Sequence, residues 1–239
     1  MIDEAKILCI IPARGGSKGL PGKNIKQLLG RPLIAWTIEQ AKKSKYIDEI
    51  FVSTDDIDIA RTSKEYGVDV PFLRPGYLAS DSASSVDVVV HVLDYYESKG
   101  IYFDIIILLE PTSPLRKEND IDAAIELLFE NKSADGLISL GEVHMEHPMI
   151  VKKINSNGRI EPYIKDVEKI SQRQQADKAY FPYGVVYMIK TDVFKLEKAF
   201  YTNNIIPYII ERWQNYEIDD IYDFYAIEAL MTYRQKKQL

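Results

Sequence analysis

The chain has 239 residues, of which 46% are hydrophobic and 28% charged, a composition that supports one large globular domain. Its formal net charge is −6, so a nucleic-acid partner, which would require a basic surface, is not expected. The one cysteine, Cys9, excludes a disulfide within the chain. Because the first residues resemble neither a secretion signal nor a membrane span, we expect a cytoplasmic protein without a membrane partner.

Apolar runs bounded by turn residues alternate with amphipathic segments along much of the chain. Continuous apolar runs are typical of strands that are buried on both faces of a parallel sheet. We predict strands at 6–13, 49–55, 103–110 and 183–190, and helices at 31–45, 58–67, 84–100 and 219–237. Strands that alternate with helices predict an α/β fold with a doubly wound, mostly parallel sheet, whose ligand crevice lies at the carboxyl ends of the strands.

Residues 141–182 break this pattern with short segments rich in turn-forming and polar residues. We interpret them as an excursion from the sheet within a single domain that spans 1–239, and we expect the excursion to form a dimer interface.

The loop after the first predicted strand reads "IPARGGSKGLPGKN" (11–24) and combines four glycines with Arg14, Lys18 and Lys23. Glycines let backbone N–H groups approach an anion closely, and the basic side chains neutralise it, so the loop indicates a polyphosphate cradle. Neither a P-loop nor a dinucleotide-binding fingerprint fits this spacing. The alternative is a glycine-rich turn with solvated lysines.

Five segments together resemble one family. They are the loop at 11–24, "LRPGYLASDSASS" (73–85), "LLEPTSPLR" (108–116), "QRQQ" (172–175) and "EIDDIYD" (217–223). In this order they are similar to the acylneuraminate cytidylyltransferases, the CMP-sialic acid synthetases. The resemblance implies a Rossmann-like nucleotidyltransferase that requires Mg²⁺. It further implies a homodimer that joins CMP from CTP to the anomeric hydroxyl of an acidic nine-carbon sugar and releases pyrophosphate.

The resemblance also implies the nucleotide site. Cytosine would be recognised by Ala13, Arg74, Ala83 and Ser85, and the triphosphate would be held by Arg14, Ser17, Lys23 and Asn24. Arg14, Lys23 and Asp219 would stabilise the charge that moves during the reaction, since phosphoryl transfer depends mainly on positioning and electrostatics. The alternatives are a surface arginine for Arg74 and a helix cap for Ser85.

Two carboxylates near the last predicted helix are candidate metal ligands. Asp219 matches the metal-binding aspartate of the family, and Glu217 stands where the family usually has another aspartate. If the segment before the helix is extended, both side chains lie on one face of it, and Mg²⁺ takes carboxylate oxygens together with phosphate and water. The alternative is that Asp219 or Asp220 caps the helix.

The sugar site would combine matched and departing positions. Arg173 matches an arginine that reaches the site of a partner subunit, and Gln174 and Ser113 lie in the same family motifs. The aromatic residues Tyr187, Phe200 and Tyr201 match the lining of the pocket for the sugar's N-acyl group, although Phe200 fits an ordinary core aromatic as well. Departures from the family are Glu110, Phe181 and Tyr183, which replace glutamine, arginine and asparagine.

An ionised glutamate only accepts hydrogen bonds, so Glu110 favours a substrate that offers an additional donor or a cationic nitrogen. Our hypothesis is a diamino sugar acid of the legionaminic or pseudaminic type, with N-acetylneuraminic acid as the second candidate. A CMP-KDO synthetase, which shares the first loop, is a further alternative. So is a nucleotide-binding protein without turnover, because fold alone does not prove activity.

Overall fold

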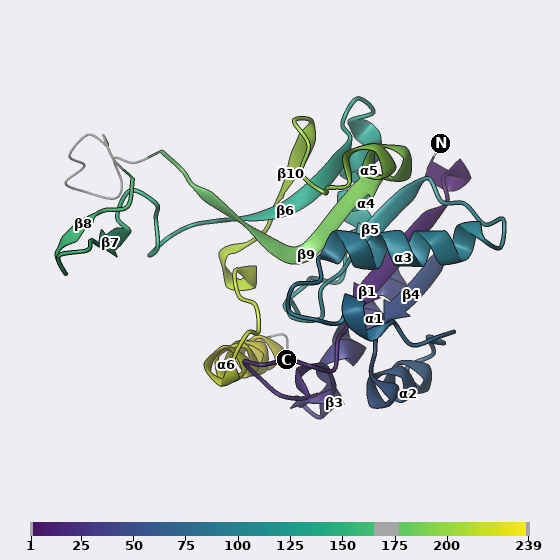
Figure 1. The fold of residues 1–239 in the computed structure, drawn as a ribbon, viewed down its shortest axis with the longest axis horizontal. Helices are drawn as coiled ribbons and strands as arrows, with labels where there is room; N and C mark the ends of the chain where they lie inside the picture. The colour runs from purple at the N-terminus through teal and green to yellow at the C-terminus, as the bar shows by residue number, and fades with distance from the viewer. Residues whose placement is uncertain (1, 165–176, 238–239) are drawn as a thin grey trace.

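The computed structural model describes residues 2–164 and 177–237 (Figure 1). Its strands are β1 (Ile7–Pro12), β2 (Gln27–Leu28), β3 (Arg31–Pro32), β4 (Glu49–Ser53), β5 (Ile105–Leu108), β6 (Gly136–Glu142), β7 (Lys152–Ile154), β8 (Ile160–Pro162), β9 (Tyr180–Lys190) and β10 (Ile205–Ile209). Its α-helices are α1 (Leu33–Lys43), α2 (Ile57–Glu65), α3 (Ser85–Glu97), α4 (Asp120–Glu130), α5 (Thr191–Glu197) and α6 (Ile221–Lys237). None of these helices is long and apolar enough to cross a membrane.

Six strands form the central sheet in the order β10-β6-β9-β5-β1-β4. The pairs β1–β4, β1–β5 and β6–β10 are parallel, whereas β9 runs antiparallel to both of its neighbours, β5 and β6. The prediction of an α/β fold with a mostly parallel sheet is therefore confirmed.

Helices cover both faces of the sheet. Alternate residues of β1 point to opposite sides: Ile7 and Cys9 join the apolar cluster that contains residues of α1, α2 and α4, and Leu8 and Ile10 join the cluster that contains residues of α3 and α5. Burial on both faces explains why the strand reads as a continuous apolar run. The same burial raises the pKa of Cys9 to about 12, so this thiol behaves as a small apolar side chain.

The described residues between β6 and β9 form an arm that extends away from the sheet (Figure 1). Strands β6 and β9 both extend from the sheet into this arm, and the hairpin of β7 and β8 lies near its tip. His147 is buried, and its Nε2 lies 2.9 Å from the carbonyl of Asp177. The sequence analysis placed this departure from the sheet at 141–182, but it did not assign α4, β6, α5 or β10.

Helix α6 packs on a cluster of its own beside the loop after β1. Its buried residues Phe224, Ile227 and Met231 contact a group that includes Leu20 and Ile218. The last helix therefore packs against the glycine-rich loop, and the residues just before it are held close to that loop. This arrangement places the carboxylates at 217–219 next to the end of β1.

Candidate active site

The loop after β1 is held by its backbone and by two side chains. Gly15 N donates to Asp55 Oδ1 at 3.0 Å, and Asn24 Nδ2 donates to the Arg14 carbonyl at 3.0 Å. A Cβ at Gly15 would lie 2.9 Å from the Cβ of Asp56, so the loop passes this close to the segment after β4 only because residue 15 is glycine. Asn24 is buried, and its amide therefore supports the loop from the inside.

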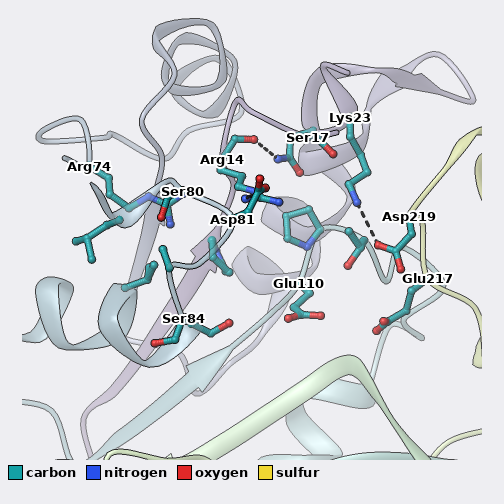
Figure 2. Close-up of a pocket in the computed structure, with 18 residues that line it drawn as sticks. Arg14, Ser17, Lys23, Arg74, Ser80, Asp81, Ser84, Glu110, Glu217 and Asp219 are labelled. Carbon is teal, nitrogen blue, oxygen red and sulfur yellow. Dashed lines mark hydrogen bonds and ion pairs between the residues drawn. The ribbon is translucent and has the colours of Figure 1, made fainter. Parts of the chain in front are cut away.

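The carboxyl ends of β1 and β5 meet at one cavity of about 330 Å³ (Figure 2). The loops after these two strands line it together with the segment before α3 and residues before α6, at the edge of the sheet where the geometry of parallel sheets predicts a ligand. The cavity is lined by ten of the residues expected in the site: Arg14, Ser17, Lys23, Asn24, Arg74, Ala83, Ser85, Glu110, Glu217 and Asp219. Figure 2 shows Arg74 at one end of the cavity and Glu217 at the other. Ala13 and Ser113 are buried and do not line it.

At one end of the cavity, Arg74 is a buried guanidinium with unused hydrogen-bonding capacity. Its side chain is only 4% exposed, its Nη2 lies 3.8 Å from Asp55 Oδ1, and its Nε has no partner among the described residues. Burial lowers the pKa of Arg74, and the neighbouring Asp55 opposes this shift. A buried donor without a partner is uncommon in folded proteins, and Arg74 lines the cavity.

The start of α3 resolves which serine caps that helix. Ser84 Oγ accepts a hydrogen bond from Asp87 N at 3.1 Å, and the Asp87 carboxylate accepts one from the backbone N–H of Ser84. This reciprocal arrangement is a capping box. Ser85 is therefore not the cap, and its side chain lines the cavity next to Ala83.

Three cations of the loop after β1 lie close to carboxylates, and two of them, Arg14 and Lys23, line the cavity. Arg14 Nη1 is 2.9 Å from Asp81 Oδ1, and Lys18 forms an ion pair with the other oxygen of Asp81. Lys23 Nζ donates to the Ile218 carbonyl at 2.6 Å and lies 3.5 Å from Asp219 Oδ1 (Figure 2). The Lys23 side chain is only 12% exposed, so its charge is directed into the cavity.

The three acidic residues before α6 have different roles. Asp220 Oδ1 accepts bonds from Tyr222 N at 2.7 Å and Asp223 N at 3.1 Å, so Asp220 caps the helix. The Asp219 side chain is 89% exposed and contacts Lys23. Asp220 is therefore the residue that caps the helix, and the Asp219 carboxylate is available to a ligand.

Glu217 is held by the protein at one of its oxygens. Ser113 Oγ donates to Glu217 Oε1 at 2.8 Å, and the backbone N–H of Gly184 donates to the same oxygen. The carboxylate thereby links the loop after β5 to β9 and to the segment before α6. This segment is not a strand, yet Glu217 and Asp219 both line the cavity.

Glu110 lies at the end of β5 and faces the same space. Burial, and then the nearby charge of Glu217, raise the pKa of Glu110 to about 7. A desolvated carboxylate beside a second one is stabilised by any ligand that donates hydrogen bonds to it or carries positive charge. Glu110 therefore favours a donor or a cation at this end of the cavity.

The aromatic residues expected in the sugar site lie beyond Glu110 on β9 and after α5. Burial, and then Glu110, raise the pKa of Tyr187, which places this tyrosine next to the carboxylate. Phe200 is buried, and its ring packs 6.2 Å from that of Tyr187, so it belongs to the core beneath the site. Phe181, Tyr183 and Tyr201 are more accessible, and Phe181 packs edge-on against Tyr183. Arg173 and Gln174 lie outside the described residues.

Sequence reasoning missed three polar residues that shape the site: Asp55, Asp81 and Arg116. Arg116 is buried, donates to the carbonyls of Val185 and Gly184 at 2.6 and 3.0 Å, and so fixes β9 against the end of β5. It closes the quoted motif "PTSPLR", but no local pattern shows that its side chain is buried. Asp81 lies between the two serines of "ASDS", and its distant partners Arg14 and Lys18 could not be read from that segment.

Comparisons with known proteins agree with this geometry. The model of the cytidylyltransferase family matches residues 8–239. A CMP-N,N'-diacetyllegionaminic acid synthase of Legionella pneumophila is 33% identical, over 97% of this chain and 98% of that protein. An N-acylneuraminate cytidylyltransferase of Escherichia coli is 31% identical over 98% of this chain, which spans 53% of that protein.

A solved structure of a CMP:2-keto-3-deoxy-manno-octonic acid synthetase in complex with CTP has the same fold. Its TM-score is 0.72 at 20% identity, and the match covers 96% of this chain and 100% of that one. The fold, the cavity and the match of the family model along nearly the whole chain lead to one assignment. The chain belongs to the cytidylyltransferase family and is a CTP-dependent nucleotidyltransferase.

Proposed function

We propose that this chain transfers CMP from CTP to the anomeric hydroxyl of a nine-carbon α-keto acid sugar and releases pyrophosphate. The observation that carries the proposal is the order of groups along one cavity. Arg74 offers an unused buried donor at one end, Arg14 and Lys23 supply positive charge in the middle, and Glu110 lies near Glu217 at the other end. Base, phosphates and sugar would occupy these three regions in turn.

The chemistry is an in-line displacement at the α-phosphorus of CTP. The sugar hydroxyl oxygen forms a bond to phosphorus, the bond from this phosphorus to the oxygen that bridges to the β-phosphate breaks, and pyrophosphate leaves. The hydroxyl proton is released to solvent. Lys23 and Arg14 hold the phosphates in line and stabilise the charge that builds on the leaving group. No covalent intermediate with the enzyme is required.

We propose that Mg²⁺ is bound at Asp219. The residues fit this ion, since Mg²⁺ is bound in nucleotide sites by one or two carboxylates together with phosphate oxygens and water. The Asp219 carboxylate is exposed beside Lys23 and is not used as a helix cap. Glu217 lines the same space, although one of its oxygens is already bound by Ser113 and Gly184. When bound, the ion would neutralise charge on the phosphates.

The favoured substrate is a diamino acid of the legionaminic or pseudaminic type. Glu110 is buried beside a second carboxylate, so it is best stabilised by an N–H donor or a cationic nitrogen on the substrate. Tyr187 and Tyr201, which lie close to each other near Glu110, supply an amphipathic wall for an N-acyl group. N-acetylneuraminic acid is the second candidate.

We further propose a homodimer formed by the arm. Apolar side chains are exposed near its tip, with Ile154 and Ile160 each about three-quarters accessible. Exposed aliphatic residues on a narrow arm are typical of a surface that is buried against another subunit. Arg173, which follows this hairpin in the sequence, would then contribute to the site of the partner.

Sedimentation velocity tests the dimer. Ile154→Asp with Ile160→Asp should convert a dimer into a monomer, whereas Leu196→Asp, which alters an equally exposed aliphatic residue on α5, should not. A wild-type monomer that is fully active at assay concentration would contradict the proposal.

We propose a cytoplasmic location because the reaction consumes CTP, a nucleotide of the cell interior. Fractionation of cells that produce the protein tests this, and recovery from the membrane or an extracellular fraction would contradict it.

Mg²⁺-dependent release of pyrophosphate from CTP tests the reaction itself. The acceptors are N,N'-diacetyllegionaminic, pseudaminic, N-acetylneuraminic and KDO acids, assayed in parallel. Much faster release with a diamino acid supports the full proposal. Release with N-acetylneuraminic acid alone would keep the reaction and contradict the role of Glu110, and release with KDO alone would assign a CMP-KDO synthetase. Binding of CTP without release would favour a non-catalytic nucleotide-binding protein.

A further inference from the structure

Asp81 lines the cavity and holds two cations of the glycine-rich loop. Its Oδ1 is 2.9 Å from Arg14 Nη1, and its Oδ2 is ion-paired with Lys18 Nζ. These residues come from different parts of the chain, because Asp81 belongs to the segment before α3 and the cations follow β1. Figure 2 shows Asp81 beside Arg14 in the middle of the cavity. Lys18 and then Arg14 lower the pKa of Asp81, so this carboxylate is ionised at neutral pH.

The position of Asp81 conflicts with the role of its partners in binding CTP. The proposed function assigns Arg14 to the triphosphate, and Lys18 lies in the same loop. An N–H group that donates to Asp81 is not free for a phosphate oxygen, and an ionised carboxylate near the phosphates repels them. For these cations to bind a polyphosphate, Asp81 must therefore be displaced from them.

We propose that Asp81 is an intramolecular competitor of polyphosphate in this site. Before CTP binds, it pairs with Arg14 and Lys18. It gives up these cations when the triphosphate of CTP binds. It pairs with them again as pyrophosphate leaves, which favours release of that product. This inference depends on the proposed function only in that these cations contact the phosphates.

Lys23 and Asp219 form a different kind of pair on the other side of the cavity. Their atoms are 3.5 Å apart, and Lys23 also has a firm bond to the Ile218 carbonyl. The proposed function assigns Asp219 to Mg²⁺, so its carboxylate would have a ligand when the phosphates bind. No comparable use is evident for Asp81, whose two oxygens face two cations in the structure.

Calorimetric titration of Asp81→Asn with CTP, pyrophosphate and CMP tests the inference. The substitution keeps the shape of the side chain and removes its charge. The two ion pairs that Asp81 forms are exposed and therefore weak. Their removal should lower the dissociation constants for CTP and pyrophosphate by about fivefold. The constant for CMP, which carries less charge, should change by less. Asp69→Asn is the matched control, because Asp69 pairs with Lys64 at 3.4 Å and does not line the cavity.

Weaker binding of CTP or pyrophosphate by Asp81→Asn would overturn the inference, and so would an equal change for CMP. Asp81→Ala repeats the test with a second side chain, and thermal unfolding confirms that each variant is folded. Tighter pyrophosphate binding without turnover of any acceptor would uphold the inference while the proposed function fails. Turnover of an acceptor, with pyrophosphate binding unchanged by Asp81→Asn, would support the proposed function and overturn the inference.

Discussion

The carboxylate side chain of Glu110 lies directly against the Cα of Gly184, and a Cβ placed at residue 184 would be 2.7 Å from the Cβ of Glu110. Gly184 N also donates to Glu217, and its carbonyl accepts from Arg116. One glycine thus fixes the positions of both carboxylates at the sugar end of the cavity.

Gly184→Ala should destabilise the protein by about 1–3 kcal/mol and weaken acceptor binding, because the clash involves a backbone-fixed Cβ and cannot be relieved by rotation of the Glu110 side chain. Urea unfolding and acceptor KM are the measurements. Gly76→Ala is the matched control, since a Cβ there meets nothing within 4 Å. Equal stability of the two variants would show that β9 tolerates the additional methyl group.

Glu110→Gln should change how stability depends on pH in the absence of Mg²⁺ and CTP. The folded protein raises the pKa of Glu110 from 4.5 to about 7, so between these values the folded state binds more protons than the unfolded state. Its stability therefore falls as pH rises through this window, by at most about 3 kcal/mol. Glutamine removes this loss, so the variant should gain stability over wild type between about pH 5 and pH 8. Urea unfolding at the two pH values measures it, and parallel behaviour of both proteins would refute the shift.

Neighbouring aspartates before α6 should respond differently to substitution. Asp219→Asn should raise the Mg²⁺ concentration needed for pyrophosphate release and lower kcat, because the proposed metal site loses its carboxylate. Asp220→Ala should leave the Mg²⁺ requirement unchanged and lower the free energy of unfolding by about 1 kcal/mol, because α6 loses its cap. Mg²⁺ titrations of activity and urea unfolding, done on both variants, separate the two roles. The assignment fails if Asp220→Ala shifts the Mg²⁺ requirement as strongly as Asp219→Asn.

Lys23→Met should lower kcat/KM for CTP by roughly 100-fold or more, because a largely buried charge directed at the phosphates is lost. Lys43→Met is the control, since Lys43 is an exposed lysine of α1 that pairs with Glu118 at 2.9 Å. Steady-state kinetics with saturating acceptor measures both. A decrease of less than about threefold for Lys23→Met would contradict its role.

The local sequence indicated β1, β4, β5 and most of β9, together with the character of the first loop. The runs at 6–13 and 103–110 contain β1 and β5 because a strand buried on both faces must be apolar at every position. The loop at 11–24 shows its glycines and cations directly, and its place after a strand predicts the edge of the sheet at which it lies. Where the sequence left a helix cap open, at Ser85 and at Asp219 or Asp220, only side-chain hydrogen bonds identified the caps, which are Ser84 and Asp220.

Only the tertiary structure decided which distant residues meet. The antiparallel direction of β9, the burial of Arg116 and the pairing of Asp81 with Arg14 each join segments that are far apart in the chain. Spacing within a segment reports which face of a helix or strand is apolar, but it carries no information about which polar groups another segment will supply. The sequence alone therefore indicated the type of ligand, whereas packing between segments set the position and charge of the groups that would bind it.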